Sequence, residues 1–402
     1  METLRVRGMN LEKEKRDICL VDACIEGNIL YAAGFEKNIL LKYDVENQET
    51  KLMGVFEGFK FSESYHNNAI FKYEESLFCF SKNSYEVAEF NLEEKRFKYY
   101  YPTDNIQERD LVRSIIRIED NIWMMRTIDN PLIMVFSMRK KRYIEHKIDT
   151  KISIENYIPL GFEKCVCIGR EIWRCIPGRQ ELFILDTKNL KTRVFETGLA
   201  SPLLTIYTEE NVIYILSASG QELIAIDVNT YGVSVYRTGY EGIVDWPFVG
   251  IVKVKNLFIF LPCFEQKIFC YELKNDKLNM IKEIELPVNF KRVQGTEKST
   301  LFLDWKKVGN TLYLLPFSGN SMVRLDLDTF AITLCPVNIT RQDYLIWSLW
   351  IMPVQSEKEI RLKEYLNTLT GEKVIAIKNT KEIKRLENFI WKFIKGGSGG
   401  AY

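Results

Sequence analysis

The stretch LFILDTKNLKTRVFETG, residues 182–198, is followed forty-one residues later by LIAIDVNTYGVSVYRTG, residues 223–239. Each segment places an aspartate, Asp186 or Asp227, at the end of an apolar run. Two such carboxylates would suit a catalytic or metal-binding site, but a recurring segment is also typical of repeat architectures. The remainder of the chain distinguishes these interpretations.

Two features recur along the chain at nearly constant spacing. The first is an apolar run that ends in an aromatic residue, at intervals of 41 to 55 residues; its positions are Tyr31, Phe78, Trp123, Trp173, Tyr214, Phe258 and Tyr313. The second is a polar residue 13 or 14 residues later; its positions are Asp44, Asn91, Ser137, Asp186, Asp227, Glu272 and Asp326. Two features that recur seven times at a nearly constant distance from each other indicate seven copies of one structural unit.

Each unit contains about four short runs of β-branched, aromatic and aliphatic residues, separated by turn-forming residues. Four strands repeated at this period are typical of a β-propeller blade. The sequence therefore predicts an all-β fold, a seven-bladed β-propeller of four-stranded antiparallel blades over residues 19–340. The recurring polar residue closes the third strand, where a short side chain accepts hydrogen bonds from backbone N–H groups of the next turn. Because Asn91 and Ser137 share this position, we interpret the aspartates as turn residues.

The repeats resemble those of the seven-bladed propeller superfamily, in particular the quinoprotein-like and YncE-like repeats. Blades of that type commonly read as an apolar strand, then D-x-x-T, then a strand ending in glycine. The resemblance is clearest over residues 164–337, in LDTKNLKTRVFETG, IDVNTYGVSVYRTG and LDLDTFAITLCPV. The chain is similar to kelch repeats more distantly, since only Ala33-Gly34 approaches their paired glycine. The resemblance implies a fold and carries over no functional residue.

Several segments lie outside the repeats. Residues 1–18 are a candidate ring-closing strand, and residues 341–395 are predicted to form a partly helical C-terminal extension. Within that extension, residues 380–394 have the apolar spacing of an amphipathic helix. We expect this helix to pack on the propeller; binding to a partner or to a membrane surface is the alternative. Residues 396–402, GGSGGAY, have the composition of a flexible linker or tag.

The composition argues against several classes of function. With 55 basic and 54 acidic residues, the net charge is +1, which gives no general electrostatic case for nucleic-acid binding. No stretch of eighteen apolar residues is present, so no transmembrane segment is expected. The nine cysteines are odd in number, irregularly spaced and mostly within apolar runs, which favours reduced thiols and a cytoplasmic location.

The loops between blades are the expected location of a binding site. In a blade with strands A to D, the D-to-A and B-to-C connections lie on one face of the disc, and loops on such a face commonly carry function. Candidate ligand- or partner-binding residues in these loops are Tyr65, His66, Arg109, Arg113, Trp246, Arg292 and Arg341. Arginines beside aromatic residues suit an acidic peptide, a carboxylate or phosphate, or a sugar acid. The alternative is that they are solvated loop residues with contacts between blades.

Catalytic and metal-binding patterns are sparse. The two histidines, His66 and His146, exclude a histidine-rich metal site, and His66 is the best single catalytic candidate. Cys165, Cys167 and Cys175 lie close in sequence, but no CxxC pair is present, so we interpret them as core thiols rather than zinc ligands. We expect no metal and no cofactor, because phosphate-binding glycine loops and the GxSxG and HExxH motifs are absent.

These observations predict a non-enzymatic binding module that recognises a protein or peptide partner through its loop-rich face. Two alternatives stay open. One is an enzyme that acts on a glycan or small acidic substrate in the central channel, with His66, arginines and carboxylates such as Glu63 or Asp110. The other is a glycan or small-molecule sensor without chemistry.

Overall fold

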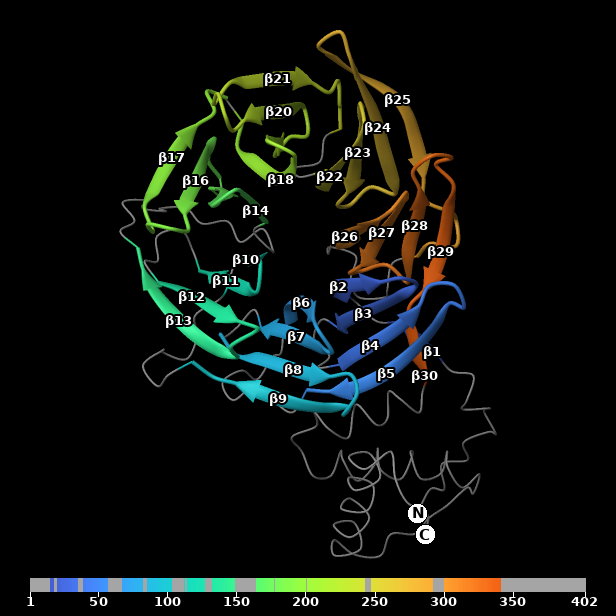
Figure 1. Ribbon diagram of the computed structural model, residues 1–402. Helices are drawn as coiled ribbons and strands as arrows, with labels where there is room; N and C mark the ends of the chain where they lie inside the picture. The colour runs from blue at the N-terminus through green and yellow to red at the C-terminus, as the bar shows by residue number, and fades with distance from the viewer. Residues whose placement is uncertain are drawn as a thin grey trace, which may run out of the picture.

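The computed structural model describes residues 15–17, 20–34, 39–56, 67–81, 85–102, 112, 114–126, 132–148, 164–176, 178–199, 201–242, 247–291 and 300–340. Within these ranges, seven antiparallel sheets of four consecutive strands surround a common axis (Figure 1). The predicted seven-bladed β-propeller is therefore confirmed. The described residues contain no helix, and therefore no helix that is long and apolar enough to cross a membrane. The predicted helix at 380–394 lies outside the described residues.

The strands of each blade follow one another in the chain. Blade 1 consists of β2 (Leu20–Glu26), β3 (Ile29–Gly34), β4 (Ile39–Asp44) and β5 (Glu49–Val55). Blade 2 consists of β6 (Asn67–Tyr73), β7 (Ser76–Ser81), β8 (Val87–Asn91) and β9 (Arg96–Tyr100). Blade 3 consists of β10 (Ser114–Ile118), β11 (Asn121–Met125), β12 (Leu132–Ser137) and β13 (Arg142–Lys147). Blade 4 consists of β14 (Cys165–Ile168), β15 (Glu171–Cys175), β16 (Glu181–Asp186) and β17 (Thr192–Glu196).

The second half of the ring repeats this order. Blade 5 consists of β18 (Leu203–Glu209), β19 (Val212–Ser217), β20 (Glu222–Asp227) and β21 (Val233–Arg237). Blade 6 consists of β22 (Phe248–Val254), β23 (Leu257–Pro262), β24 (Lys267–Lys274) and β25 (Lys277–Glu285). Blade 7 consists of β26 (Phe302–Val308), β27 (Thr311–Pro316), β28 (Ser321–Asp326) and β29 (Ile332–Pro336).

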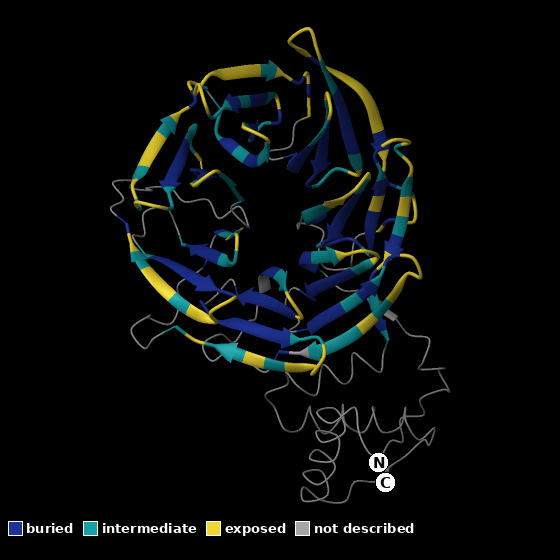
Figure 2. Cartoon of the chain, viewed as in Figure 1, coloured by how far each residue is buried: buried dark blue, intermediate teal, exposed yellow. Residues whose placement is uncertain are grey.

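The hydrophobic core lies between blades. The second and third strands are buried on both faces, whereas the outermost strands are largely exposed (Figure 2). Seven clusters of buried apolar side chains lie one at each junction of neighbouring blades. Strands buried on both faces read as short continuous apolar runs rather than alternating ones, which explains the repeated runs in the sequence.

The recurring aromatic residue packs toward the next blade. Trp173, for example, belongs to the cluster between blades 4 and 5, and Tyr214 to the cluster between blades 5 and 6. Blade 6 is offset by one residue, because its equivalent position is occupied by Ile259, which packs toward blade 7. The aromatic residue found in the sequence, Phe258, faces blade 5 instead. The repeat assignment was thus wrong by one position in this blade.

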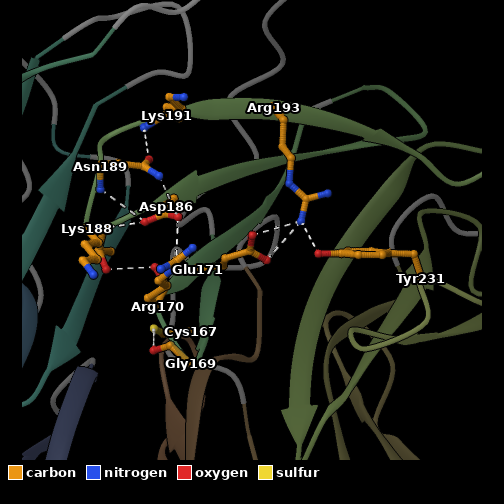
Figure 3. Close-up of polar contacts among 11 residues, drawn as sticks. Cys167, Gly169, Arg170, Glu171, Asp186, Lys188, Asn189, Lys191, Arg193 and Tyr231 are labelled. Atoms are coloured by element: carbon orange, nitrogen blue, oxygen red, sulfur yellow. Dashed lines mark hydrogen bonds and ion pairs between the residues drawn. The ribbon is translucent and has the colours of Figure 1, made fainter.

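The recurring polar residue is a turn residue, as predicted. Asp227 Oδ1 accepts hydrogen bonds from the backbone N–H groups of Asn229 and Thr230, at 2.8 and 3.1 Å. The same two-bond arrangement occurs at Asp44, Asn91, Asp186 and Asp326. At Ser137 the hydroxyl accepts one bond, from the N–H of Lys140 at 3.3 Å. Figure 3 shows the turn at Asp186, where the second carboxylate oxygen also pairs with Arg170 at 3.0 Å.

Glu272 is the exception, and the length of its turn explains it. Strands β24 and β25 are joined by only two residues, Asn275 and Asp276, with positive φ angles of 51° and 56°. Such a tight hairpin satisfies its own backbone groups and needs no side-chain acceptor. The Glu272 carboxylate accepts a hydrogen bond from Asn256 Nδ2 at 2.8 Å instead.

Removing one turn carboxylate should have a modest and local effect. The Asp227→Ala substitution is expected to lower the free energy of unfolding by about 1 kcal/mol, since two N–H groups lose their acceptor at an exposed turn, where water replaces it. Urea denaturation followed by circular dichroism measures this change. Asp227→Asn is the matched control, because Asn91 performs the same role in blade 2. An alanine variant as stable as the asparagine variant would contradict the assigned role.

The ring is closed by segments from both ends of the propeller. Strand β1 (Lys15–Asp17) pairs with β30 (Asn338–Thr340) outside the blades. Two residues just after blade 7, Val337 and Ile339, are buried in the cluster between blades 7 and 1. Closure therefore combines a two-stranded sheet with apolar packing, and each of the seven blades keeps four consecutive strands.

The rims of blades 4 and 5 are joined by a polar contact (Figure 3). Arg193 Nη2 lies 3.0 and 3.1 Å from the two carboxylate oxygens of Glu171 and donates a hydrogen bond to the hydroxyl of Tyr231 at 2.7 Å. The Tyr231 ring in turn stacks on Trp173, with ring centroids 6.3 Å apart. Because Tyr231 belongs to blade 5 and the other three residues to blade 4, this contact has a clear structural role.

Candidate functional site

The two faces of the disc differ in the length of their connections. First and second strands are joined by two residues in every blade, and third and fourth strands by two to five. We call this side the turn face. The opposite side, the loop face, carries the connections between second and third strands, which are four to six residues long, and those between successive blades, which are 6 to 17 residues long. The long connections therefore gather on one face, where loops on a rigid scaffold usually carry function.

The seven residues predicted to bind a ligand or partner lie outside the described residues. They are Tyr65, His66, Arg109, Arg113, Trp246, Arg292 and Arg341. The carboxylates Glu63 and Asp110 also lie there. All of these assignments stay predictions.

The other histidine and the neighbouring cysteines have packing roles. His146 lies on the outermost strand of blade 3, with its ring stacked on Trp123 at a centroid distance of 5.7 Å. Burial lowers the pKa of this imidazole. Cys165 and Cys167 face the cluster between blades 3 and 4, whereas Cys175 faces the cluster between blades 4 and 5. The three thiols therefore point to opposite sides of one sheet and do not form a common site.

A group of residues that the sequence analysis missed surrounds the propeller axis. Strand pairing identifies side chains at the same height on the innermost strands β2, β6, β10, β14, β18, β22 and β26. One height, which we call the axial layer, is occupied by Asp22, Ala69, Ser114, Lys164, Thr205, Gly250 and Asp304. Lys164 directly precedes β14 and extends this layer into blade 4.

Backbone irregularities lie next to this layer. In blades 1, 2, 5, 6 and 7 the pairing of the innermost strand shifts by one residue immediately before the axial layer. A β-bulge of this kind redirects side chains and is common beside binding sites. Its recurrence in five innermost strands makes the axial layer a repeated structural feature rather than an accident of one blade.

Four charged side chains of alternating sign meet in the axial layer. Lys306, two residues beyond Asp304 on β26, places its Nζ 2.5 Å from Asp22 Oδ1 and 2.8 Å from Asp304 Oδ2. Lys164 Nζ lies 2.8 Å from Asp304 Oδ1. Blades 4 and 7 are not neighbours in a ring of seven, so the pair between Lys164 and Asp304 crosses the axis. The side chains of Lys164, Asp304 and Lys306 are still 22–30% exposed, which means that water reaches them.

Two backbone N–H groups also donate hydrogen bonds to this charged group, both to Asp22. The carboxylate of Asp22, only 8% exposed, accepts hydrogen bonds from the N–H groups of Ala23 at 2.8 Å and Ile70 at 2.9 Å. Since Ile70 belongs to blade 2, this aspartate connects blades 1, 2 and 7. Its position is therefore tightly fixed.

An aromatic ring borders the layer on the side of blade 6. Lys164 Nζ lies 3.1 Å from the centroid of the Trp305 ring, over its face. The same indole lies against Gly250, where a Cβ atom would overlap its Cη2 and Cζ3 atoms. Glycine at this position of blade 6 is thus explained by the ring beside it, and Lys164 makes both a cation–π contact and an ion pair.

The surroundings shift the pKa values of the two carboxylates of the layer in opposite directions. Burial raises the pKa of Asp22 to about 6, with Lys306 acting in the opposite direction. Burial also opposes ionisation of Asp304, but Lys164 and Lys306 outweigh it and hold the pKa of Asp304 below its usual range. Burial lowers the pKa of Lys164 despite the neighbouring Asp304. Asp304 is therefore the firmly ionised centre of the group.

Mild acidification should stabilise the fold through Asp22. The pKa of Asp22 is about 6 in the folded chain, above the value of about 4 in unfolded chains. As the pH falls through 6, the folded state takes up a proton before the unfolded state does. Protonation of Asp22 therefore raises the free energy of unfolding by about 1 kcal/mol between about pH 7 and pH 5, and this stabilisation is lost as the pH rises again. The contribution of Asp304 is lost only at lower pH, because its folded pKa is depressed.

Thermal unfolding of the wild type and of Asp22→Asn across this pH range measures the effect. The wild type should gain stability relative to the variant as the pH falls. Parallel pH profiles of the two proteins would contradict the raised pKa of Asp22.

Other ion pairs on the innermost strands join neighbouring blades. Glu26 pairs with Lys72 at 2.7 Å between blades 1 and 2, and Glu209 pairs with Lys253 at 2.7 Å between blades 5 and 6. These pairs lie nearer to the turn face, at the ends of their strands. Unlike the pair between Lys164 and Asp304, which crosses the axis, these pairs hold neighbouring blades together.

The repeat itself could have revealed the axial layer. Counting nine residues back from Tyr31, Trp173, Tyr214 and Tyr313 gives Asp22, Lys164, Thr205 and Asp304. What the spacing does not give is which of these side chains meet, because that depends on the order of blades around the axis.

The chain was compared with known proteins in sequence and in structure. No protein-family model matches it, and no curated protein matches it in sequence. Its fold is similar to virginiamycin B lyase from Staphylococcus aureus, with a TM-score of 0.54, 9% identity, and 77% of this chain and 97% of that chain covered. It is also similar to the WD40 repeats of RRP9, with a TM-score of 0.52, 11% identity, and coverage of 77% and 88%.

A chain of the mitotic checkpoint complex gives a TM-score of 0.52 at 10% identity, with 79% of this chain and 94% of that chain covered. At such low identity these likenesses concern architecture and not activity. Together with the seven four-stranded sheets, they establish that the chain is a seven-bladed β-propeller.

Proposed function

We propose that this protein is a binding module that recognises a protein or peptide partner through its loop face. The observation that supports this proposal is the asymmetry of the disc. Connections of 6 to 17 residues leave one face, whereas the turn face has connections of two to five residues. A rigid scaffold that presents varied loops on a single face is well suited to recognition, and the propeller fold is compatible with a binding module.

Exposed apolar groups on the loop face support the same proposal. Val288, in the connection after β25, is 97% exposed, and Tyr101, in the connection after β9, is 44% exposed. Aromatic and arginine side chains are the groups that most often dominate a protein interface. The candidate residues Tyr65, His66, Arg109, Arg113, Trp246, Arg292 and Arg341 supply both kinds.

Affinity capture with matched variants tests the proposed face. The tagged 402-residue chain would be used to recover partners from its native cell, in parallel with Trp246→Ala and Arg292→Ala variants. Recovery of a specific partner is expected to fall about tenfold in each variant. Asn229→Ala, on the turn face, is the control, because Asn229 contributes its backbone N–H and not its side chain to the turn at Asp227.

Two results would count against the proposal. Unchanged recovery with Trp246→Ala and Arg292→Ala would show that the loop face is not the recognition surface. Equal loss with Asn229→Ala would place recognition on the turn face or reflect a general loss of folded protein, which circular dichroism of the variants separates.

A further inference from the structure

We propose that the axial layer binds a small zwitterion, a molecule that carries an ammonium and a carboxylate group a few bonds apart, as a free amino acid does. This site is separate from the partner-binding surface proposed above. In the bound state the ligand would lie between Lys164 and Asp304, with its carboxylate on the lysine and its ammonium on the aspartate.

The pair between Lys164 and Asp304 differs from the structural ion pairs of the ring. It crosses the axis between blades that do not touch as neighbours, whereas Glu26 with Lys72 and Glu209 with Lys253 join adjacent blades. Lys164 also lies at the loop-face end of its short innermost strand. A pair in this place can open without separating two packed blades.

The balance of charge selects the class of ligand. The two aspartates and two lysines of the layer sum to zero when all are ionised. A ligand with net charge would leave one uncompensated charge in a partly buried site, which is unfavourable. A zwitterion inserted between Lys164 and Asp304 replaces one ion pair by two and preserves neutrality. Lys306 keeps its contacts with Asp22 and Asp304 throughout.

The position of Lys164 indicates where the ligand ammonium would lie. Its own ammonium rests over the Trp305 ring and against Asp304, so this corner of the layer already holds an alkylammonium group. An aromatic face beside a carboxylate is a suitable receptor for such a cation. A ligand ammonium would take over these contacts as Lys164 turns to the ligand carboxylate.

A buried hydroxyl in the same layer provides an independent argument. Thr205 is only 2% exposed, and its Oγ1 has no hydrogen-bond partner among the described residues. Buried polar atoms are usually satisfied, and this hydroxyl lies at the height of Asp22 and Asp304, where a bound ligand could supply its partner. The bulges beside Thr205 and Gly250 redirect both strands at this height.

Binding to the intact chain tests the proposal. Isothermal titration calorimetry and thermal unfolding would be carried out with each common amino acid and β-alanine, and with acetate and methylammonium as half-molecules at equal ionic strength. At least one zwitterion should bind saturably and about tenfold more tightly than either half-molecule. Equal binding of acetate or of methylammonium would replace the zwitterion site by a simple anion or cation site. No binding of any zwitterion would overturn the proposal.

Variants locate the site. Lys164→Gln and Asp304→Asn should each weaken binding about tenfold, and Lys253→Gln, which breaks an ion pair between neighbouring blades, should leave it unchanged. Valine has nearly the same shape as threonine, and the hydroxyl that it removes has no hydrogen-bond partner among the described residues. The Thr205→Val variant should therefore fold normally and still lose affinity for the ligand. Wild-type affinity in both Thr205→Val and Lys164→Gln would place the ligand elsewhere and overturn the assignment. Partner capture through the loop face is unaffected by either outcome.

Discussion

Replacing Lys306 by methionine should lower the free energy of unfolding by about 3 kcal/mol at neutral pH. The lysine pairs with both Asp22 and Asp304; without it Asp22 would lose its ion-pair partner and face the carboxylate of Asp304, which keeps Lys164. Loss of one member of a buried ion pair typically costs about 3–5 kcal/mol, and we take the lower end because the Lys306 side chain is 30% exposed. Guanidinium denaturation at pH 7 measures the change.

An exposed lysine with similar partners provides the control. Lys267 lies 2.9 Å from Glu283 and 3.8 Å from Glu285, but all three side chains are 39–77% exposed. Lys267→Met should therefore cost less than about 1 kcal/mol. Equal effects of the two substitutions would show that solvent screens the axial charges as fully as it does surface charges.

The pH dependence separates lost charge from lost packing in the Lys306 variant. If the cost arises from unpaired carboxylates, it should shrink as the pH falls and Asp22 takes up a proton. A cost that stays constant from neutral to acidic pH would instead indicate that the aliphatic part of Lys306 was responsible.

Substituting valine for Gly250 is expected to lower the free energy of unfolding by about 3 kcal/mol. A Cβ atom at this position would overlap the ring of Trp305, and the ammonium of Lys164 lies over the face of the same ring. Either the partly buried indole or the backbone of β22 must shift to relieve this overlap, so the strain falls on the junction between blades 6 and 7. Thermal and chemical unfolding both report this loss.

Two further variants identify the overlap as the cause. In Gly250→Val combined with Trp305→Ala, the substitutions should be less than additive, because the valine then fills space that the ring has left. Gly232→Val is the control, because the φ of Gly232 is not positive and the atom nearest to an added Cβ would be Thr230 Oγ1, at 3.2 Å. A Gly250 variant no less stable than the Gly232 variant would contradict the close packing of Trp305.

The fold could be predicted from the sequence because its strands and turns depend on short-range interactions. Strand runs and turn residues depend on side chains within a few positions of one another, so the aspartate turns and the number of blades follow from their spacing. The misplacement in blade 6 has the same origin: the equivalent residue, Ile259, is not aromatic, but the preceding residue, Phe258, is and imitates the repeat one position early. The candidate loop residues do not repeat, and spacing alone assigns them no role.

By itself, the sequence determined the repeating unit, the four strands of each blade, and the interpretation of Asp186 and Asp227 as turn residues. Only the tertiary structure decided that Asp22, Lys164 and Asp304 would meet, since their positions span most of the propeller and their contact requires seven blades, a closed ring and bulges at one height. The physical reason is that hydrogen-bonded turns form between neighbours in the chain, whereas ion pairs across an axis exist only once every intervening blade has fixed the geometry.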